Sequence, residues 1–71
     1  MDYRKLITLF DGGKEVLLQH NMLTDATIFR DIQCILEVEG EKLSDETLIR
    51  FVSIFKSIRD RLKEIENGKQ V

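Results

Sequence analysis

The stretch SDETLIRFVSIFKSIRDRLKEIE, residues 44–66, decides the fold, because its apolar residues recur at spacings of three and four. The residues that share this spacing are Leu48, Phe51, Phe55, Ile58, Leu62 and Ile65. Side chains three and four positions apart lie on the same face of an α-helix. No Gly or Pro interrupts the run. The pattern therefore predicts one long amphipathic helix over residues 44–66, about 35 Å in length.

Capping signals mark both ends of this predicted helix. Ser44 fits an N-cap, where its hydroxyl accepts a hydrogen bond from an otherwise unpaired backbone N–H. Asp45 and Glu46 follow in the first turn, where the helix dipole favours negative charge. Asn67 and Gly68 predict a stop just before them, because Gly tolerates the left-handed conformation that ends many helices.

The two halves of the predicted helix differ in how much of their surface is apolar. Ile49, Val52 and Ile54 widen the stripe in the first half, so apolar side chains nearly surround the helix there. A helix that is apolar on most sides is buried on several sides. We therefore expect the first half to form the centre of the core, with Phe51 and Phe55 as anchors. The second half keeps a narrow apolar seam among charged residues, which predicts a single contact partner.

Length, composition and charge restrict the class of protein. A chain of 71 residues has room for one domain, residues 1–71, and a domain of this size is only marginally stable alone. The net charge of -2 gives no overall attraction to nucleic acid or to an anionic membrane. No apolar run approaches the ~20 residues needed to span a bilayer, and the single cysteine suits a reducing compartment. We therefore expect a soluble, cytoplasmic protein without membrane association.

Shorter helices are predicted ahead of the long one. The apolar spacing predicts helices over about residues 2–10 and 24–38, and Asp11-Gly12-Gly13 ends the first of them. Residues 14–21 suit either a short helix or a strand, and we favour a helix because a lone strand would have no partner. The short link between the last two helices predicts an antiparallel hairpin. The expected fold class is all-α, a small three- or four-helix bundle with a long C-terminal helix and an αα-hairpin core.

No set of residues indicates catalysis or a bound cofactor. His20 and Cys34 are the only candidates for a nucleophile with its base, and nothing in the sequence brings them together. Gly12-Gly13-Lys14 lacks the spacing of a phosphate-binding loop, and the acidic residues over 37–46 lack the order of a calcium loop. We therefore expect a protein that is not an enzyme and that holds no metal ion or other cofactor.

Positive charge is concentrated on the predicted long helix and forms a candidate partner surface. Its residues are Arg50, Arg59, Arg61 and Lys63. They do not share one face, since Arg59 lies almost opposite Arg50 and Arg61 around a helix. They carry the alternative hypothesis, a nucleic-acid-associated transcriptional regulator that uses the last two helices as a helix-turn-helix. In that motif the first residues of the second helix face the bases. Here these residues include Asp45 and Glu46, which would repel phosphate, so nucleic acid binding is the weaker hypothesis.

The apolar seam near the end of the long helix is the predicted contact surface. Antiparallel pairing leaves about two or three turns of this helix beyond the helix over residues 24–38. Unless the first helix covers this overhang, which is the competing explanation, Ile58, Leu62 and Ile65 would be exposed, and an exposed apolar stripe marks an interaction site. The sequence thus predicts a non-enzymatic protein–protein interaction module. We expect an adaptor, inhibitor or regulator that forms a homodimer through these three residues and binds a protein partner.

Overall fold

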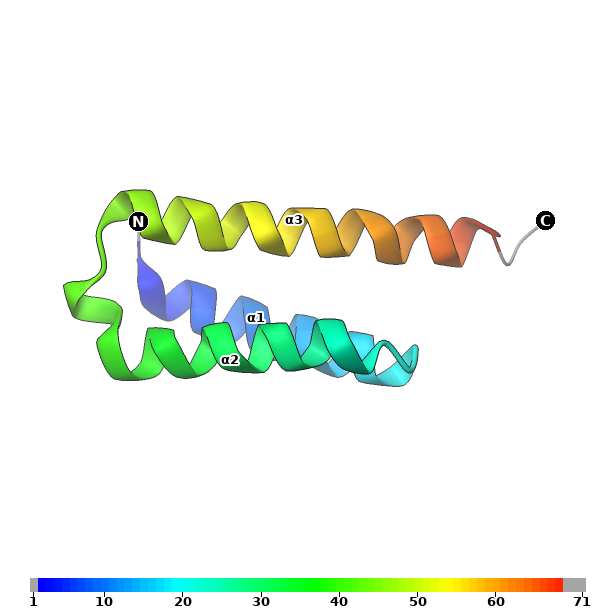
Figure 1. Cartoon of the computed structure of the whole chain (residues 1–71), viewed down its shortest axis with the longest axis horizontal. Coiled ribbons are helices and arrows are strands. Elements are labelled where there is room, and N and C mark those ends of the chain that lie inside the picture. The colour runs from blue at the N-terminus through cyan, green and yellow to red at the C-terminus, as the bar shows by residue number, and fades with distance from the viewer. Residues whose placement is uncertain (1, 69–71) are drawn as a thin grey trace.

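Three α-helices form the fold, and the computed structural model describes residues 2–68 (Figure 1). The helices are α1 (Tyr3–Gln19), α2 (Leu23–Glu39) and α3 (Asp45–Gly68), with one turn of 3-10 helix at Gly40–Lys42 between α2 and α3. No strand occurs in the described part of the chain. The predicted all-α class with a long C-terminal helix is therefore confirmed.

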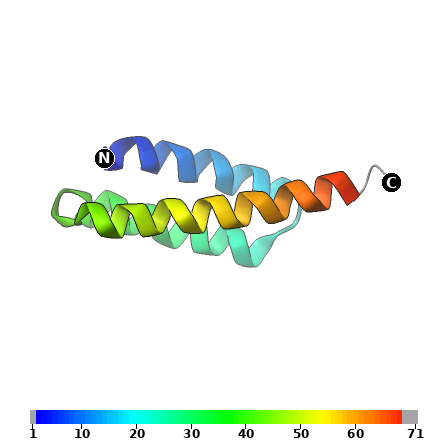
Figure 2. The same ribbon diagram turned by 90° about the horizontal axis from the view of Figure 1, so that it is seen from above.

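The helices lie roughly along one direction. α1 and α3 run the same way and α2 runs the opposite way (Figures 1 and 2). α2 and α3 thus form the predicted antiparallel hairpin across Gly40–Lys42. The backbones of α1 and α2 are nevertheless the closest pair, and α3 lies over both at a wider spacing. The result is an elongated three-helix arrangement of 45 × 18 × 17 Å.

α1 passes without a break through Gly12 and Gly13. The predicted division into two helices, over residues 2–10 and 14–21, is therefore wrong, although the second segment is helix and not strand. Each glycine costs about 1 kcal/mol relative to alanine in a helix interior. The continuous helix offsets this cost because it buries one apolar face against α2 and α3.

The turn between α1 and α2 is a Schellman motif centred on Asn21. This residue has φ 59°, a left-handed conformation that Asn tolerates better than most residues. The N–H of Met22 donates to the carbonyl of Leu17 at 2.9 Å, and the N–H of Asn21 donates to the carbonyl of Leu18 at 3.1 Å. These bonds satisfy the last carbonyl groups of α1, so the helix ends cleanly and α2 begins within three residues.

Side-chain caps fix the starts of α1 and α3. Oδ1 of Asp2 accepts a hydrogen bond from the backbone N–H two residues later at 3.0 Å. Oγ of Ser44 accepts one from the N–H three residues later at 3.2 Å, which confirms the predicted N-cap. At its other end α3 continues through Asn67 and Gly68, two residues beyond the predicted stop.

One phenylalanine from each helix meets at the centre of the core. Phe10 of α1 packs edge-on against Phe29 of α2 and Phe55 of α3, with ring centroids 4.9 and 5.4 Å apart. Phe29 and Phe55 stack at 5.3 Å. These two rings lie directly on the backbone of α1, because a Cβ atom at Gly13 would lie 2.7 Å from Phe29 and 3.0 Å from Phe55. Phe55 is thus a core contact as predicted, although it is only half-buried.

The first half of α3 is not buried on several sides, contrary to the prediction. Leu48 is buried, whereas Ile49 is 53% exposed. Ile54 is also exposed, and Phe51 and Val52 are half-buried. Since α1 and α2 cover only one side of α3, the additional apolar residues remain at the surface.

The start of α1 contacts the joint between α2 and α3. Gly40 is buried at this joint, and the ring of Tyr3 packs against its backbone. A Cβ atom at Gly40 would overlap that ring. Glycine at this position therefore allows the first turn of α1 to dock onto the joint.

Candidate interaction site

The predicted self-association seam is divided between core and surface. Ile58 is 3% exposed and belongs to the core, so its predicted place on an exposed seam is wrong. Leu62 is half-buried and packs against the core, and Ile65 is 42% exposed. These three residues do not form a free apolar surface.

The position of α2 explains why Ile58 is buried. Arg61 bonds Asp25 near the start of α2, so α2 extends along α3 to one turn beyond Ile58. At the far end of α1, His20 Nε2 lies 3.3 Å from Glu66 Oε1. Only the last part of α3 extends past the α1–α2 turn (Figure 1). The overhang predicted to begin near residue 58 is therefore wrong.

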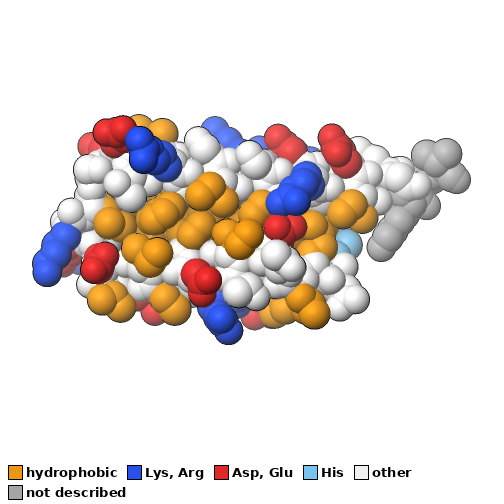
Figure 3. All heavy atoms as spheres, in the orientation of Figure 1, with side chains coloured by type: hydrophobic (Ala, Val, Ile, Leu, Met, Phe, Trp, Pro, Cys, Tyr) orange, Lys and Arg blue, Asp and Glu red, His pale blue; other side chains and the backbone are white. Residues whose placement is uncertain are grey.

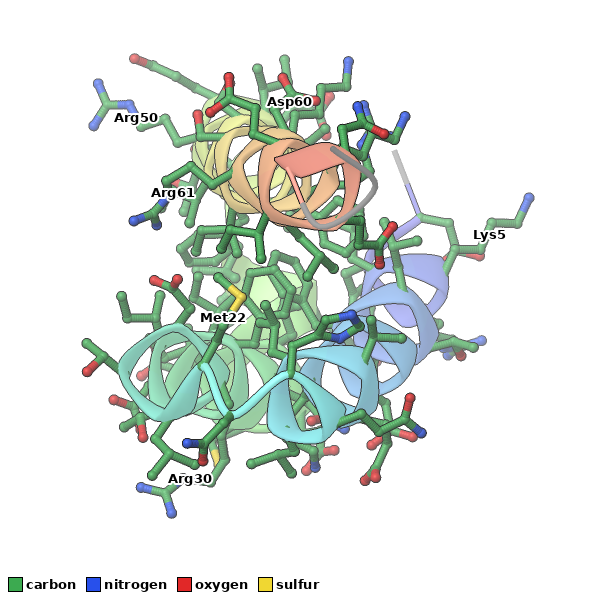
Figure 4. The ribbon with its side chains drawn as sticks, turned by 90° about the vertical axis from the view of Figure 1, so that its right-hand side faces the viewer. Lys5, Met22, Arg30, Arg50, Asp60 and Arg61 are labelled. Atoms are coloured by element: carbon green, nitrogen blue, oxygen red, sulfur yellow. The ribbon has the colours of Figure 1, made fainter. Side chains whose placement is uncertain are left out.

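The predicted basic surface is split between two sides of α3. Arg50 and Arg61 lie on the α2 side (Figure 4). Arg59 lies about 160° around the helix from Arg61 and lines a groove against α1. Lys63, about 40° from Arg59, belongs to this second side. No single surface contains all four cations.

Each of the three arginines also has an acidic neighbour. The side-chain N–O distances are 2.9 Å for Arg61–Asp25, 3.1 Å for Arg50–Glu46 and 3.8 Å for Arg59–Asp60. Because Asp25 is buried, its bond from Arg61 ties α2 to α3. Arginines that are divided and paired in this way form no continuous track for phosphates, so the geometry does not favour the nucleic-acid hypothesis.

The structure does not bring His20 and Cys34 together as a catalytic pair. Nδ1 of His20 lies 3.0 Å from the carbonyl oxygen of Val16 at the end of α1. Cys34 is exposed on α2, about 18 Å along the helix from the α1–α2 turn.

Within residues 2–68, no group of three or more His, Cys, Asp or Glu side chains is placed to hold a metal ion. Over the same residues, no helix is both long and apolar enough to span a membrane.

A band of apolar side chains lies at the surface between α2 and α3 (Figure 3). We define the α2–α3 strip as Ile28 and Ile35 of α2 and Ile54 of α3, which are 37%, 39% and 37% exposed. Ile54 lies about 20° from Arg61 around α3. Ile28 follows Asp25 by one turn of α2. The Arg61–Asp25 bond therefore places both sides of the strip next to each other.

The two edges of the α2–α3 strip carry opposite charges. Arg50 and Arg61 lie on the α3 edge, four residues before and seven residues after Ile54. Asp31 and Glu39 lie on the α2 edge, one turn after each of its isoleucines. Figure 3 shows charged side chains along the margins of the apolar band. Arg50 and Arg61 already pair with Glu46 and Asp25, so the contrast in charge between the two edges is partial.

A second apolar surface is a groove of about 510 Å³ between α1 and α3, on the other side of α3 from the strip. Its apolar lining includes Leu9, Gly13, Val16, Leu17, Phe55 and Leu62. Lys5 and Arg59 are the charged residues of the lining, and no acidic side chain belongs to it. We call this surface the α1–α3 groove.

The sequence contained a signal for each surface, although neither was predicted. The apolar stripe of α2 includes Ile28 and Ile35 beside its buried members, and it is wider than two neighbouring helices can cover. The groove lies beside Gly12 and Gly13, whose lack of side chains leaves room on α1. The two glycines were interpreted only as a helix stop, and this interpretation hid their effect on the surface.

Neither the strip nor the groove identifies a reaction by its own chemistry. The strip consists of isoleucines between charged edges, and the lining of the groove contains no His, Cys, Asp or Glu. Both are surfaces suited to contact with another molecule. Comparison with known proteins does not identify that molecule, since no family model, no curated protein and no solved structure matches the chain.

Proposed function

We propose that this chain is a non-enzymatic helical interaction module that self-associates through the α2–α3 strip. The observation that carries the proposal is the band of exposed isoleucines between α2 and α3. A contiguous apolar patch on a small protein is typical of a contact with another protein. As an adaptor, inhibitor or regulator, such a module acts by presenting a surface and requires no chemistry of its own.

The charged edges of the α2–α3 strip favour one arrangement of two copies. When the two-fold axis is parallel to the helices, α3 of one copy faces α2 of the other. The basic edge of each copy then lies opposite the acidic edge of its partner. A two-fold axis across the helices would bring the basic edges together. Complementary charges select orientation more than they add affinity, and a two-fold contact closes because both copies use the same surface.

The size of the strip predicts a weak, concentration-dependent dimer. The face formed by α2 and α3 measures about 25 Å by 20 Å from helix dimensions, so two copies would bury about 1,000 Å² in total. Interfaces below about 1,200 Å² belong to the weak or transient class. The association is therefore expected to respond to protein concentration, and to depend on the isoleucines more than on salt.

The test replaces Ile35→Glu together with Ile54→Glu and measures sedimentation over a range of concentrations. Both side chains are already partly exposed, so the helical circular dichroism and melting temperature should stay close to wild type. A matched control replaces Leu23→Glu and Ile49→Glu, which are 59% and 53% exposed. These two lie about 120° or more around their helices from the strip residues of the same helix.

The expected result is that the wild type and the control variant form dimers while the strip variant stays a folded monomer. A wild type that remains monomeric at high micromolar concentration would overturn the proposal. Equal loss of the dimer in both variants would also overturn it, because the association would then follow total surface hydrophobicity and not the α2–α3 strip.

A further inference from the structure

The α1–α3 groove is a second binding surface, separate from the α2–α3 strip. Phe29 and Phe55 lie at its floor, where both rings press on the backbone of α1 at Gly13. Its volume of about 510 Å³ falls in the range that binding sites in proteins usually have. The groove and the strip flank opposite sides of α3, so one copy can use both at once.

The shape of the groove suits a helix. The lining extends along α1 from Lys5 to Leu17, which is about 18 Å or three helical turns. Leu9 is 43% exposed and Val16 is exposed too, so a single acyl chain lying there would keep much of its surface in water. No side chain occupies the space beside Gly12, which allows another backbone to approach α1 closely. A helix with apolar anchors one turn apart fills such an open groove.

The charge of the groove selects an acidic occupant. Lys5 lies on the α1 side of the groove, and Figure 4 shows it directed away from Arg50 and Arg61. Arg59 lies on the α3 side of the groove. Lys56 and Lys63 precede and follow Arg59 by three and four residues, so they continue the same edge of α3. Arg59 has the longest of the three arginine pairs, 3.8 Å to Asp60, in a chain whose net charge is -2. Positive charge beside an apolar floor is therefore a local feature of this surface.

We propose that the α1–α3 groove binds an amphipathic helix of another protein that carries acidic residues beside its apolar face. The bound helix runs antiparallel to α1 and α3, because that direction opposes its dipole to theirs. It adds a fourth helix to the three of this chain, in the manner of an antiparallel bundle. Nucleic acid fits this surface less well, since most of the lining is apolar and offers phosphates nothing.

This proposal rests on the proposed function, an interaction module. It names acidic amphipathic helices as the partner class for the α1–α3 groove, which self-association through the α2–α3 strip leaves open. Its test uses the full chain and two synthetic peptides of about 15 residues, which span about 22 Å as helices. Both peptides carry leucines at positions i, i+4, i+7 and i+11. One has glutamates and the other has lysines at the flanking positions. Fluorescence anisotropy of labelled peptide measures the dissociation constant for each.

The chain itself supplies the matched variants for this experiment. Lys5→Glu combined with Arg59→Glu reverses the charge of the groove. Arg50→Glu is the control, because Arg50 lies on the opposite side of α3 (Figure 4) and also has an acidic neighbour at 3.1 Å. Circular dichroism confirms that each variant stays helical. Palmitate and a short DNA duplex are added as competitors in separate titrations.

The wild type and the Arg50→Glu variant should bind the glutamate peptide at least about tenfold more tightly than the lysine peptide, and the groove variant, which keeps Lys56 and Lys63, should lose this preference. The inference would be overturned if the two peptides bound equally well, or if Arg50→Glu removed or reversed the preference between them. It would also be overturned if palmitate or DNA bound and the glutamate peptide did not. The variant with Ile35→Glu and Ile54→Glu should bind the glutamate peptide like the wild type, even where the wild type does not dimerise. Loss of peptide binding in that variant would assign the peptide to the α2–α3 strip and overturn the inference.

Discussion

The α1–α2 pair and α3 are held by different kinds of contact. α1 and α2 pack with their backbones close together, joined by the Schellman turn at Asn21 and by buried Ala26. α3 lies over them at a wider spacing, supported by the ring of Phe55 and tied by the Arg61–Asp25 bond. The groove between the helices of the close pair is smaller, about 300 Å³, and its lining includes the charged residues Lys14, Glu15 and Arg30. Both proposed binding surfaces flank α3, because a helix spaced by large side chains leaves apolar surface on either side.

The largest expected loss of stability comes from removing a ring of the aromatic centre, which joins α3 to the α1–α2 pair. Phe10 and Phe29 are almost fully buried, so replacing either with Ala should cost about 3–5 kcal/mol. In a domain of 71 residues this approaches the whole stability. Phe55→Ala should cost less, because that ring is half-buried. Urea titration followed by circular dichroism checks the order, and equal losses at all three positions would contradict the difference in burial.

A smaller effect is expected from the bond that ties α3 to α2. Arg61→Ala leaves the buried carboxylate of Asp25 without its partner, which should cost about 1–3 kcal/mol of stability. The exposed pair of Arg50 and Glu46 is the control, and Arg50→Ala should cost at most about 0.5 kcal/mol. Melting temperatures of the two variants measure the contrast. Equal shifts would show that burial of Asp25 has no energetic effect.

The smallest effects come from the two adjacent glycines of α1, and they differ in sign. A Cβ atom at Gly12 meets nothing within 4 Å, so Gly12→Ala should stabilise the chain by about 0.5–1 kcal/mol through helix propensity. At Gly13 the same change overlaps the rings of Phe29 and Phe55. Strain of about 1–3 kcal/mol then outweighs the gain. If both variants melted above the wild type, the rings of Phe29 and Phe55 would be free to move away from α1 at little cost.

The sequence predicted the helices of this fold better than the contacts between them. Capping at Ser44 and the long stripe of α3 depend on neighbouring residues, so local rules were sufficient. Gly12 and Gly13 were misinterpreted because the rings that pack on the backbone of α1 at Gly13 belong to Phe29 and Phe55, which are distant in sequence. Ile58 was placed on the surface because pairing with the helix over residues 24–38 was expected to leave it beyond that helix, whereas the Arg61–Asp25 bond shows that α2 extends past it. The two proposed surfaces depend on which members of each apolar stripe the other helices reach. The wide stripe of α2 and the paired glycines of α1 indicate that such surfaces exist, but not which side chains stay exposed.

The contact between Tyr3 and Gly40 makes tyrosine fluorescence a measure of how the start of α1 is docked. The chain contains one tyrosine and no tryptophan, so its tyrosine fluorescence comes from a single ring. That ring lies where the first turn of α1 meets the joint between α2 and α3. Its emission therefore follows the docking of one chain end without a label, while far-ultraviolet circular dichroism follows the helices as a whole. Fraying of α1 and global unfolding can thus be distinguished in the unmodified protein.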